Sequence, residues 1–461
     1  MQRTTSPFGA TAFAVLASAL CLSAQGPGSC GIHLDVLANL TSTHSAVADV
    51  PGYPGAFGGY PVGAPGNPFN AYCLPGTIAT FRLTVAPSAL GPAPFGPGST
   101  VTILYSVGAA PLVFPPPPGT IPGCGGAPWV ISVLPPAGAI IDGLGLFGPA
   151  PIPAPSDPGH PGKLEVPVFV PFGFPFGVPV FFQAVITDPL FGMLGVSNGV
   201  ALIAGPNPAE ASLIPGLVPC GGFPALDEGG AVTPTPPGFT FYGFPAPVCT
   251  VHVNGYIDFG PVAVAAGCDF VGTPGDLGCP PVTPTASPRI AVNHFDADFG
   301  VPVPGGRIAD LTAEFDPGLF GIPRLIVRWK NVANFGSPAA PPALDTNYSS
   351  HVAELWGASP IAPFPGSRMI VVRQEQHSVT TLANHDMVGI GPGPFLPFGP
   401  PTACIPLAMW TLWGFPPVPA GPGGEAIYQD TVIDSAFLSN LAVVFDPLFP
   451  FPPVPYMVGV Y

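Results

Sequence analysis

The sequence predicts an all-β fold, made of tandem antiparallel β-sandwich domains with loops rich in proline and glycine. The chain has 73 Pro and 61 Gly among 461 residues, and inside a helix each Pro costs about 3 kcal/mol and each Gly about 1 kcal/mol. Apolar residues make up 47% of the chain and charged residues only 8%. That supply of apolar side chains suits a buried core and differs from the composition of disordered chains. Short β-prone runs bounded by Pro and Gly clusters supply the strands.

The N-terminus, residues 1–24, is predicted to be a secretory signal peptide. Arg3 supplies the positive start, the run AFAVLASALCL supplies the apolar centre, and small residues precede a cleavage site before Gln25. We therefore expect a secreted protein that is extracellular or held at the cell surface. Lipid attachment through Cys21 is the alternative, but the residues before it match a lipobox poorly. No later apolar run of about 20 residues lacks Pro or Gly, so no membrane span is expected.

The cysteines predict disulfides. Cleavage after residue 24 leaves eight of the nine cysteines, and an even count in an exported chain is typical of disulfide bonding. Cys268 and Cys279 flank a short loop of Gly and Pro and are the candidates for one local disulfide. The first predicted domain holds an odd number of cysteines. Either one disulfide therefore crosses to the rest of the chain, with Cys220 the best placed, or two thiols stay free.

The net charge limits the partners. The formal charge is −15, with only 10 Lys and Arg residues. Nucleic acid and anionic lipid surfaces attract basic proteins, so neither is an expected partner.

The pattern of strands and loops predicts four segments after the signal peptide. Residues 27–205 form a first β-sandwich, 206–218 a linker, 219–392 a second β-sandwich, and 400–461 a short C-terminal β segment. Strands of the first sandwich are predicted at 79–85, 99–107, 128–134, 164–170 and 179–188. Strands of the second are predicted at 238–244, 249–260, 289–300, 307–316, 323–332, 349–356, 368–376 and 385–391.

A weak repeat relates the C-terminal segment to the first sandwich. The run FFQAVITD at 181–188 is similar to IYQDTVID at 427–434, and each is followed by Ser-Asn and an apolar run. We interpret 400–461 as a shortened copy of the end of the first sandwich.

Two strand patterns in the second sandwich predict local geometry. The pair Asn254-Gly255 lies between β-prone runs in VHVNGYIDFG and predicts a hairpin with a two-residue turn, in which Val253 pairs with Tyr256. The run RLIVRWK at 324–330 alternates. Its apolar residues are expected in the core, and Arg324, Arg328 and Lys330 are expected in water as a solvated face.

The order of these segments resembles a known family. GFTFYGFPAPVCTVHVNGYIDFG, PRIAVNHFDADFG, RLIVRWKNV, SSHVAELW, RMIVVRQEQ and MVGIG resemble the successive strands of nidogen-like β-sandwich domains. The family usually has Trp where Phe295 stands, and the Pro-rich insert 261–288 is unusual for it. The runs PVFFQAVITD and LGVSNGVALIAG are similar to a β-rich module of secreted proteins in planctomycete-type bacteria. Both resemblances imply an extracellular setting, and the first implies adhesion or a matrix role.

Candidate chemical sites are few. GVSNG at 195–199 matches the Gly-x-Ser-x-Gly elbow of hydrolases around Ser197, but the helix that the elbow needs is not predicted after it. HFDADFG offers His294, Asp296 and Asp298. The two Asp residues are calcium candidates because Ca²⁺ prefers hard oxygen ligands. They could also be a carboxylate pair for acid–base catalysis or a solvated loop. A zinc site would need more clustered His or Cys ligands than the sequence shows.

These observations favour a secreted, non-catalytic adhesive, matrix or surface-structural protein. Its expected partner is an extracellular matrix or cell-surface protein or polysaccharide. One alternative is a carbohydrate-binding module that stacks sugars on exposed Trp356 or Trp413. Another is a secreted hydrolase that uses Ser197 or the Asp296 and Asp298 pair. No cofactor other than calcium is expected.

Overall fold

The structure is a computed structural model, and almost all of its ordered elements are strands, as the sequence predicted. It describes residues 32–43, 69–85, 100–107, 137–142, 156–157, 160–161, 163–187, 194–259, 269, 272–282, 286–300, 309–316, 323–334, 348–358, 369–377, 387–393, 401, 403–406, 425–430, 442–447 and 456–460. The predicted signal peptide and the predicted strand at 128–134 lie outside these residues.

The chain divides into two compact units. The first comprises Met1–Ala38 and Ser42–Gly205, and the second comprises Asn39–Thr41 and Pro206–Tyr461. Each unit has its own apolar core between two sheets.

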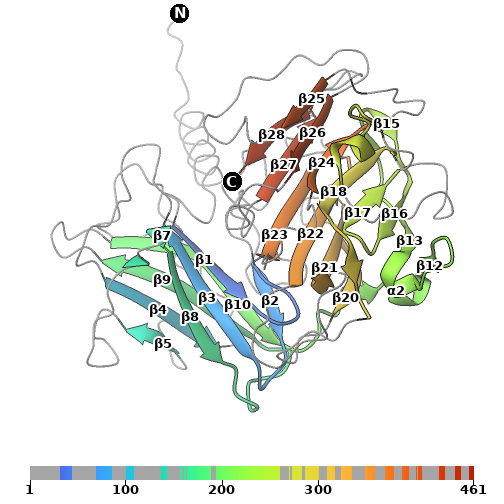
Figure 1. Cartoon of the computed structure of the whole chain (residues 1–461). Helices are drawn as coiled ribbons and strands as arrows, with labels where there is room; N and C mark the ends of the chain where they lie inside the picture. Colours follow the sequence, from blue (N-terminus) through green and yellow to red (C-terminus); the bar gives the residue numbers. More distant parts are fainter. Residues whose placement is uncertain are drawn as a thin grey trace, which may run out of the picture. The chain divides into compact units, whose positions relative to one another are not determined.

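The first unit contains a three-stranded and a five-stranded sheet (Figure 1). The three-stranded sheet has the order β1 (Ile32–Leu37), β3 (Ile78–Val85), β8 (Lys163–Phe169). The five-stranded sheet has the order β2 (Asn70–Cys73), β10 (Leu194–Ala204), β9 (Pro179–Thr187), β4 (Thr100–Val107), β5 (Ala137–Asp142). A small hairpin joins β6 (Ser156–Asp157) and β7 (His160–Pro161). Alternate residues of the strands fill the core, where the rings of Phe81 and Phe182 from opposite sheets lie 4.5 Å apart.

The second unit contains two eight-stranded sheets, here called sheet E and sheet F. Sheet E has the order β11 (Glu210–Ser212), β20 (Asp310–Asp316), β21 (Arg324–Asn334), β22 (Tyr348–Trp356), β23 (Ile370–His377), β27 (Ala442–Pro447), β28 (Tyr456–Val460), and β19 (Ala297–Asp298) also pairs with β21. Sheet F has the order β12 (Val218–Pro219), β13 (Gly229–Pro234), β16 (Val248–His252), β17 (Tyr256–Asp258), β18 (Arg289–His294), β24 (Met387–Gly391), β26 (Glu425–Asp430), β25 (Ala403–Pro406). The other described elements are the hairpin β14 (Thr240–Phe241) and β15 (Phe244–Pro245), helix α2 (Ala225–Glu228), and the 3-10 helices η4 (Ile214–Gly216) and η5 (Pro274–Leu277).

Sheets E and F pack face to face on a core of aliphatic and aromatic side chains. Val251 and Ile257 of sheet F and Val327 and Trp329 of sheet E belong to it, and all are fully buried. The Trp329 indole nitrogen donates a hydrogen bond of 2.8 Å to the backbone carbonyl of His252. The tryptophan therefore fastens the two sheets together as well as filling the space between them.

The segments predicted as a linker and as a C-terminal copy belong to the sheets of the second unit. Residues 206–218 carry β11 and η4, and β11 pairs with β20. The C-terminal strands, red in Figure 1, extend both sheets: β26 pairs with β24, and β27 pairs with β23. In the first unit β9 and β10 are neighbours in one sheet, whereas β26 and β27 belong to different sheets. The similar runs at 181–188 and 427–434 therefore occupy different topological positions.

The predicted hairpin is present, but its register differs by one residue. His252 pairs with Tyr256, so the turn has three residues rather than two. Gly255 ends the turn with φ +77°, a left-handed conformation that suits this loop length. A Cβ on Gly255 would lie 2.0 Å from the carbonyl oxygen of Asn293. The shift places the His252 and Tyr256 rings on one face, where they stack with centroids 4.1 Å apart.

The basic face of β21 is not in water, which corrects the prediction. Arg324 and Lys330 are buried, and each basic side chain is paired with acidic ones. Arg324 lies 2.7 Å from Asp316, and Lys330 forms an ion pair with Glu210 of β11. The further pairs are Arg324 with Glu354 at 3.2 Å, Arg328 with Glu210 at 2.5 Å and with Glu314 at 2.7 Å, and Arg373 with Glu354 at 3.1 Å. Acidic residues on other strands of sheet E compensate these positive charges, whose burial without a partner would be costly.

The disulfide at Cys279 differs from the predicted one. Cys279 pairs with Cys404 of β25, 125 residues away, with Cα atoms 5.9 Å apart. Cys268 lies outside the described residues. Closeness in sequence predicted the wrong partner for Cys279 because the pairing of strands in sheet F brings β25 close to η5. Cys220 is also disulfide-bonded.

Within the described part of the chain, none of the helices has the length and apolar character needed to cross a membrane.

Candidate functional site

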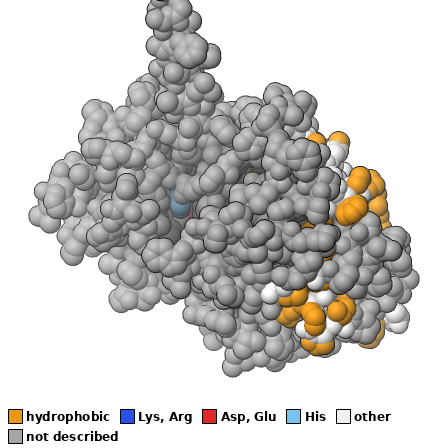
Figure 2. Space-filling view, turned by 90° about the horizontal axis from the view of Figure 1, so that it is seen from above, with side chains coloured by type: hydrophobic (Ala, Val, Ile, Leu, Met, Phe, Trp, Pro, Cys, Tyr) orange, Lys and Arg blue, Asp and Glu red, His pale blue; other side chains and the backbone are white. Residues whose placement is uncertain are grey.

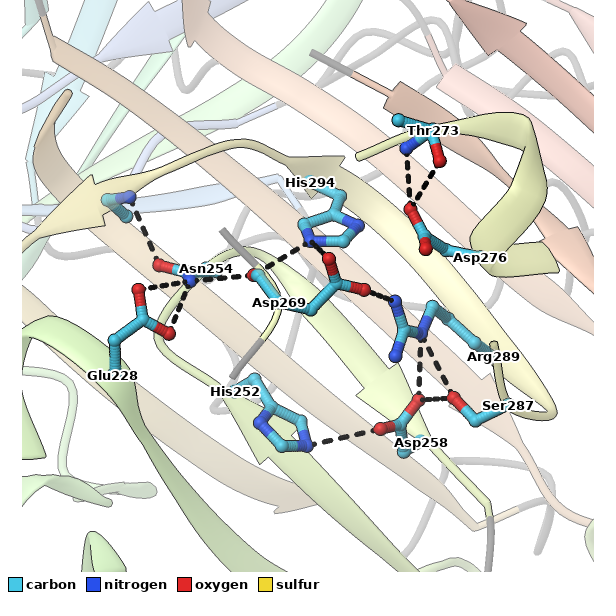
Figure 3. A network of polar contacts seen from close by, with 11 residues as sticks. Glu228, His252, Asn254, Asp258, Asp269, Thr273, Asp276, Ser287, Arg289 and His294 are labelled. Carbon is cyan, nitrogen blue, oxygen red and sulfur yellow. Dashed lines mark hydrogen bonds and ion pairs between the residues drawn. The ribbon is translucent and has the colours of Figure 1, made fainter. Parts of the chain in front are cut away.

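The side chain of Asn254 is the centre of a polar network on sheet F (Figure 3). Its amide nitrogen donates to both carboxylate oxygens of Glu228 at 3.0 Å and to the backbone carbonyl of Asp269 at 2.9 Å. Its amide oxygen accepts a hydrogen bond of 3.1 Å from the backbone nitrogen of Ala297. The residue is 1% exposed. The turn that predicted the hairpin therefore also joins α2, Asp269 and β19.

Three carboxylates meet on one side of this network. Asp227, Glu228 and Asp296 each offer an oxygen, and these oxygens lie within 4.8 Å of one another. Asp227 and Glu228 end the short helix α2, while Asp296 directly precedes β19. A hydrogen bond of 3.0 Å from the backbone nitrogen of Phe299 to the carbonyl of Leu226 holds the two segments together. One oxygen of Asp296 is buried and has no hydrogen-bond partner.

The electrostatics of this carboxylate cluster favour protons or cations. Burial raises the pKa of Glu228 to about 8, and the carboxylates of Asp296 and Asp227 add to the effect against the lowering by Asn254. Burial, with Asp227 and Asp298 nearby, raises the pKa of Asp296 to about 6. Burial and Asp298 also raise the pKa of Asp227. Carboxylates this close repel one another when ionised, and a hard cation with oxygen ligands removes that repulsion.

The structure thus divides the residues that the sequence grouped as HFDADFG. Asp296 joins Asp227 and Glu228, which the sequence had not singled out. Asp298 accepts a hydrogen bond of 2.7 Å from the backbone nitrogen of Gly300, as in an ordinary turn. His294 lies with a different set of acidic residues. The calcium prediction therefore moves from the pair Asp296 and Asp298 to the carboxylate cluster.

A second set of charges lies beside Asn254 on the outer face of sheet F. The guanidinium of Arg289 bonds to Asp258 at 2.9 Å and also to Asp269. Asp258 further accepts a hydrogen bond of 2.6 Å from Ser287 and lies 3.3 Å from the His252 imidazole. The guanidinium and these hydrogen bonds, acting against burial, hold the pKa of Asp258 well below its usual range. Arg289 also lies over the Tyr256 ring, 4.1 Å from its centroid.

Ser197 is a structural residue of the first unit. It is fully buried in a bulge of β10, where its hydroxyl accepts from the backbone nitrogen of Ala184 at 2.9 Å and donates to the carbonyl of Asn198 at 2.8 Å. Asn198 bonds to both backbone groups of Leu34 on the opposite sheet, at 2.9 and 3.0 Å. The Ser-Asn pair therefore joins two sheets, and no helix follows it. The strand–turn–helix context of a hydrolase elbow is missing.

The tryptophan proposed as a sugar platform is not at the surface. Trp356 is 3% exposed, and the Arg324 guanidinium lies 5.0 Å from its ring centroid. Trp413 lies outside the described residues. A buried indole cannot stack on a sugar, so the structure removes one of the two residues on which the carbohydrate-binding alternative depended.

Comparisons with known proteins leave the family open. No family model, curated protein or solved structure matches the chain. The nidogen-like character of residues 219–392 and the planctomycete-type character of the first unit therefore stay predictions from sequence.

Proposed function

We propose that the chain is a secreted, non-catalytic protein with an adhesive, matrix or surface-structural role. Its partner is an extracellular matrix or cell-surface protein or polysaccharide, bound through the second unit. The observation that carries this proposal is a set of exposed valines on the outer face of sheet F, described next.

Val218, Val232 and Val248 form this set, called the outer valine strip. They are 53%, 59% and 52% exposed. Val232 is opposite Thr250 and Val248 is opposite Pro234, so the two valines lie on the same face of β13 and β16. Alternate residues of these strands, such as Val251 of β16, face the core. In the view of Figure 2, too, the described side chains at the surface are mostly apolar. Apolar groups exposed together on a sheet mark surfaces that bind other macromolecules.

Two further observations support the proposal. Cys279–Cys404 and the disulfide of Cys220 are typical of proteins that fold in an oxidising compartment. The hydroxyl of Ser197, the nucleophile that a hydrolase would need, is engaged in backbone hydrogen bonds. With a net charge of −15, the apolar strip is better suited than electrostatic attraction to hold a polyanionic matrix.

The test is binding of the secreted chain to immobilised matrix polysaccharide and to cell-envelope fractions. The variant Val232→Thr/Val248→Thr keeps β-branched side chains but removes apolar surface, and we expect it to bind about tenfold more weakly, which corresponds to about 1.4 kcal/mol. The control is Phe172→Ser, which removes an 81% exposed side chain of the first unit and should bind like the wild type. Equal binding by the wild type and the double variant would contradict the role of the strip. An absence of wild-type binding to every fraction would contradict the adhesive function.

A further inference from the structure

We propose that Asp269, Asp276 and His294 form a structural site for a divalent transition-metal ion, with Zn²⁺ as the best-suited ion. The site is separate from the carboxylate cluster and from the outer valine strip. It fastens the segment 272–279, which carries the disulfide cysteine Cys279, to the outer face of sheet F.

The three residues come from different elements and meet in the interior. Asp269 lies in the loop after β17, Asp276 in η5 and His294 at the end of β18. They are 6%, 1% and 0% exposed. One possible ligand atom from each, which for His294 is either ring nitrogen, lies within 4.8 Å of the other two. Zn²⁺ holds nitrogen and oxygen ligands at about 2.0–2.2 Å, so an ion would draw these atoms inward by roughly an ångström.

The imidazole of His294 has one buried nitrogen that makes no hydrogen bond. Its Nε2 lies 3.2 Å from the backbone carbonyl of Asp269, which fixes the ring proton on Nε2. The other nitrogen, Nδ1, then carries a lone pair, and it is buried with no hydrogen-bond partner. Figure 3 shows the ring between the Asp269 and Asp276 side chains. A buried acceptor without a donor costs roughly 1–3 kcal/mol, whereas a metal ion would use the lone pair directly.

Hydrogen bonds and one ion pair hold the three side chains in place. The Nε2 proton is held by a backbone carbonyl, the usual partner of a metal-bound histidine. The Asp276 carboxylate accepts hydrogen bonds from the Thr273 backbone nitrogen at 2.7 Å and hydroxyl at 2.8 Å, which belong to the capping box of η5. One oxygen of Asp269 is held by Arg289, while the other lies 4.0 Å from the imidazole Nε2, too far for a hydrogen bond.

The local charge also favours a dication. Asp258, Asp269 and Asp276 bring three carboxylates to this part of sheet F, where Arg289 is the guanidinium that pairs with the first two.

The loop is shaped to lie directly on His294. A Cβ on Gly272 would come within 2.6 Å of the His294 carbonyl oxygen and 2.9 Å of its Cβ. Only glycine permits this approach, so the backbone at Gly272 lies directly against the backbone and Cβ of His294.

The ligand set favours zinc over calcium. Calcium prefers oxygen ligands throughout, whereas one imidazole with two carboxylates suits zinc better.

The test is metal content and stability of the full secreted chain. Because the ligands are buried, zinc is supplied during expression, and the protein is then dialysed against metal-free buffer. We expect about one zinc per chain by mass-spectrometric metal analysis, and a lower unfolding temperature after removal by a chelator. His294→Gln and Asp276→Asn should each lose the zinc. His252→Gln, which changes the other histidine of the network, and Asp296→Asn, which changes the carboxylate cluster, should retain it.

X-ray absorption of the zinc-loaded wild type keeps the proposal testable if a variant fails to fold. We expect nitrogen and oxygen ligands with one imidazole. Sulfur ligands would overturn the proposal, since the zinc would then be held by cysteines. A metal-free wild-type chain, or zinc retained by both His294→Gln and Asp276→Asn, would also overturn it.

Discussion

Replacing Glu228 with Gln should stabilise the second unit at alkaline pH. Burial, with Asp296 and Asp227 nearby, raises the pKa of Glu228 from 4.5 to about 8 in the folded chain. Between these values the folded state holds a proton that the unfolded state has released, so the free energy of unfolding falls as the pH rises. The loss is absent below pH 4.5 and complete above pH 8. Glu228→Gln removes the ionisation and leaves an amide oxygen for Asn254 to bond.

The magnitude follows from the pKa difference. At 1.36 kcal/mol per pH unit, a rise from 4.5 to about 8 corresponds to about 5 kcal/mol. Protein relaxation and the entry of water reduce such penalties, so we expect the variant to exceed the wild type by about 2–3 kcal/mol at pH 8.5. At pH 4.5 the two proteins should be equally stable, because Glu228 is then protonated in the folded state.

The assay is urea unfolding followed by tryptophan fluorescence in the presence of a chelator, between pH 4.5 and 8.5. Four of the five Trp residues belong to the second unit, so the signal reports mainly on it. The control is Glu165→Gln in the first unit, which breaks the 2.6 Å ion pair with Arg82 and should not stabilise the chain at any pH. A wild-type stability that is flat over this range, or a Glu228→Gln variant less stable than the wild type at pH 8.5, would refute the reasoning.

Three further predictions concern calcium, the disulfide and the bulge of β10. Millimolar Ca²⁺ should raise the unfolding temperature of the second unit above pH 7, and Asp296→Asn should remove most of the rise. An equal rise in the wild type and in Asp296→Asn would contradict the carboxylate cluster as the calcium site. The variant Cys279→Ser/Cys404→Ser should lose about 2–5 kcal/mol in urea unfolding because the disulfide closes a long loop, and unchanged stability would contradict this pairing. Ser197→Ala should cost the first unit about 1–3 kcal/mol in the same assay, because it leaves the buried nitrogen of Ala184 without its acceptor; a neutral effect would contradict the structural role.

Much of the strand pattern could be predicted from local sequence. The runs at 79–85, 164–170 and 324–332 are strands because β-branched and aromatic residues alternate between Pro and Gly clusters. The Asn254-Gly255 pair predicted a hairpin, and one is present. The register was missed by one residue because Asn254 is held in place by Glu228, Asp269 and Ala297. Those partners are not sequence neighbours, so no turn rule could include them.

The candidate sites show the same division more sharply. The sequence by itself determined that the chain is all-β, because Pro and Gly at this density exclude long helices. It also placed acidic side chains at the end of the strand predicted at 289–300. Only the tertiary structure decided which residues these side chains lie against. Asp296 lies with carboxylates of α2, and His294 lies with a carboxylate of η5. The structure also decided that Cys279 pairs with Cys404 of β25. Carboxylates, imidazoles and thiols act at a few ångströms, and residues far apart in sequence come that close only when the sheets have formed.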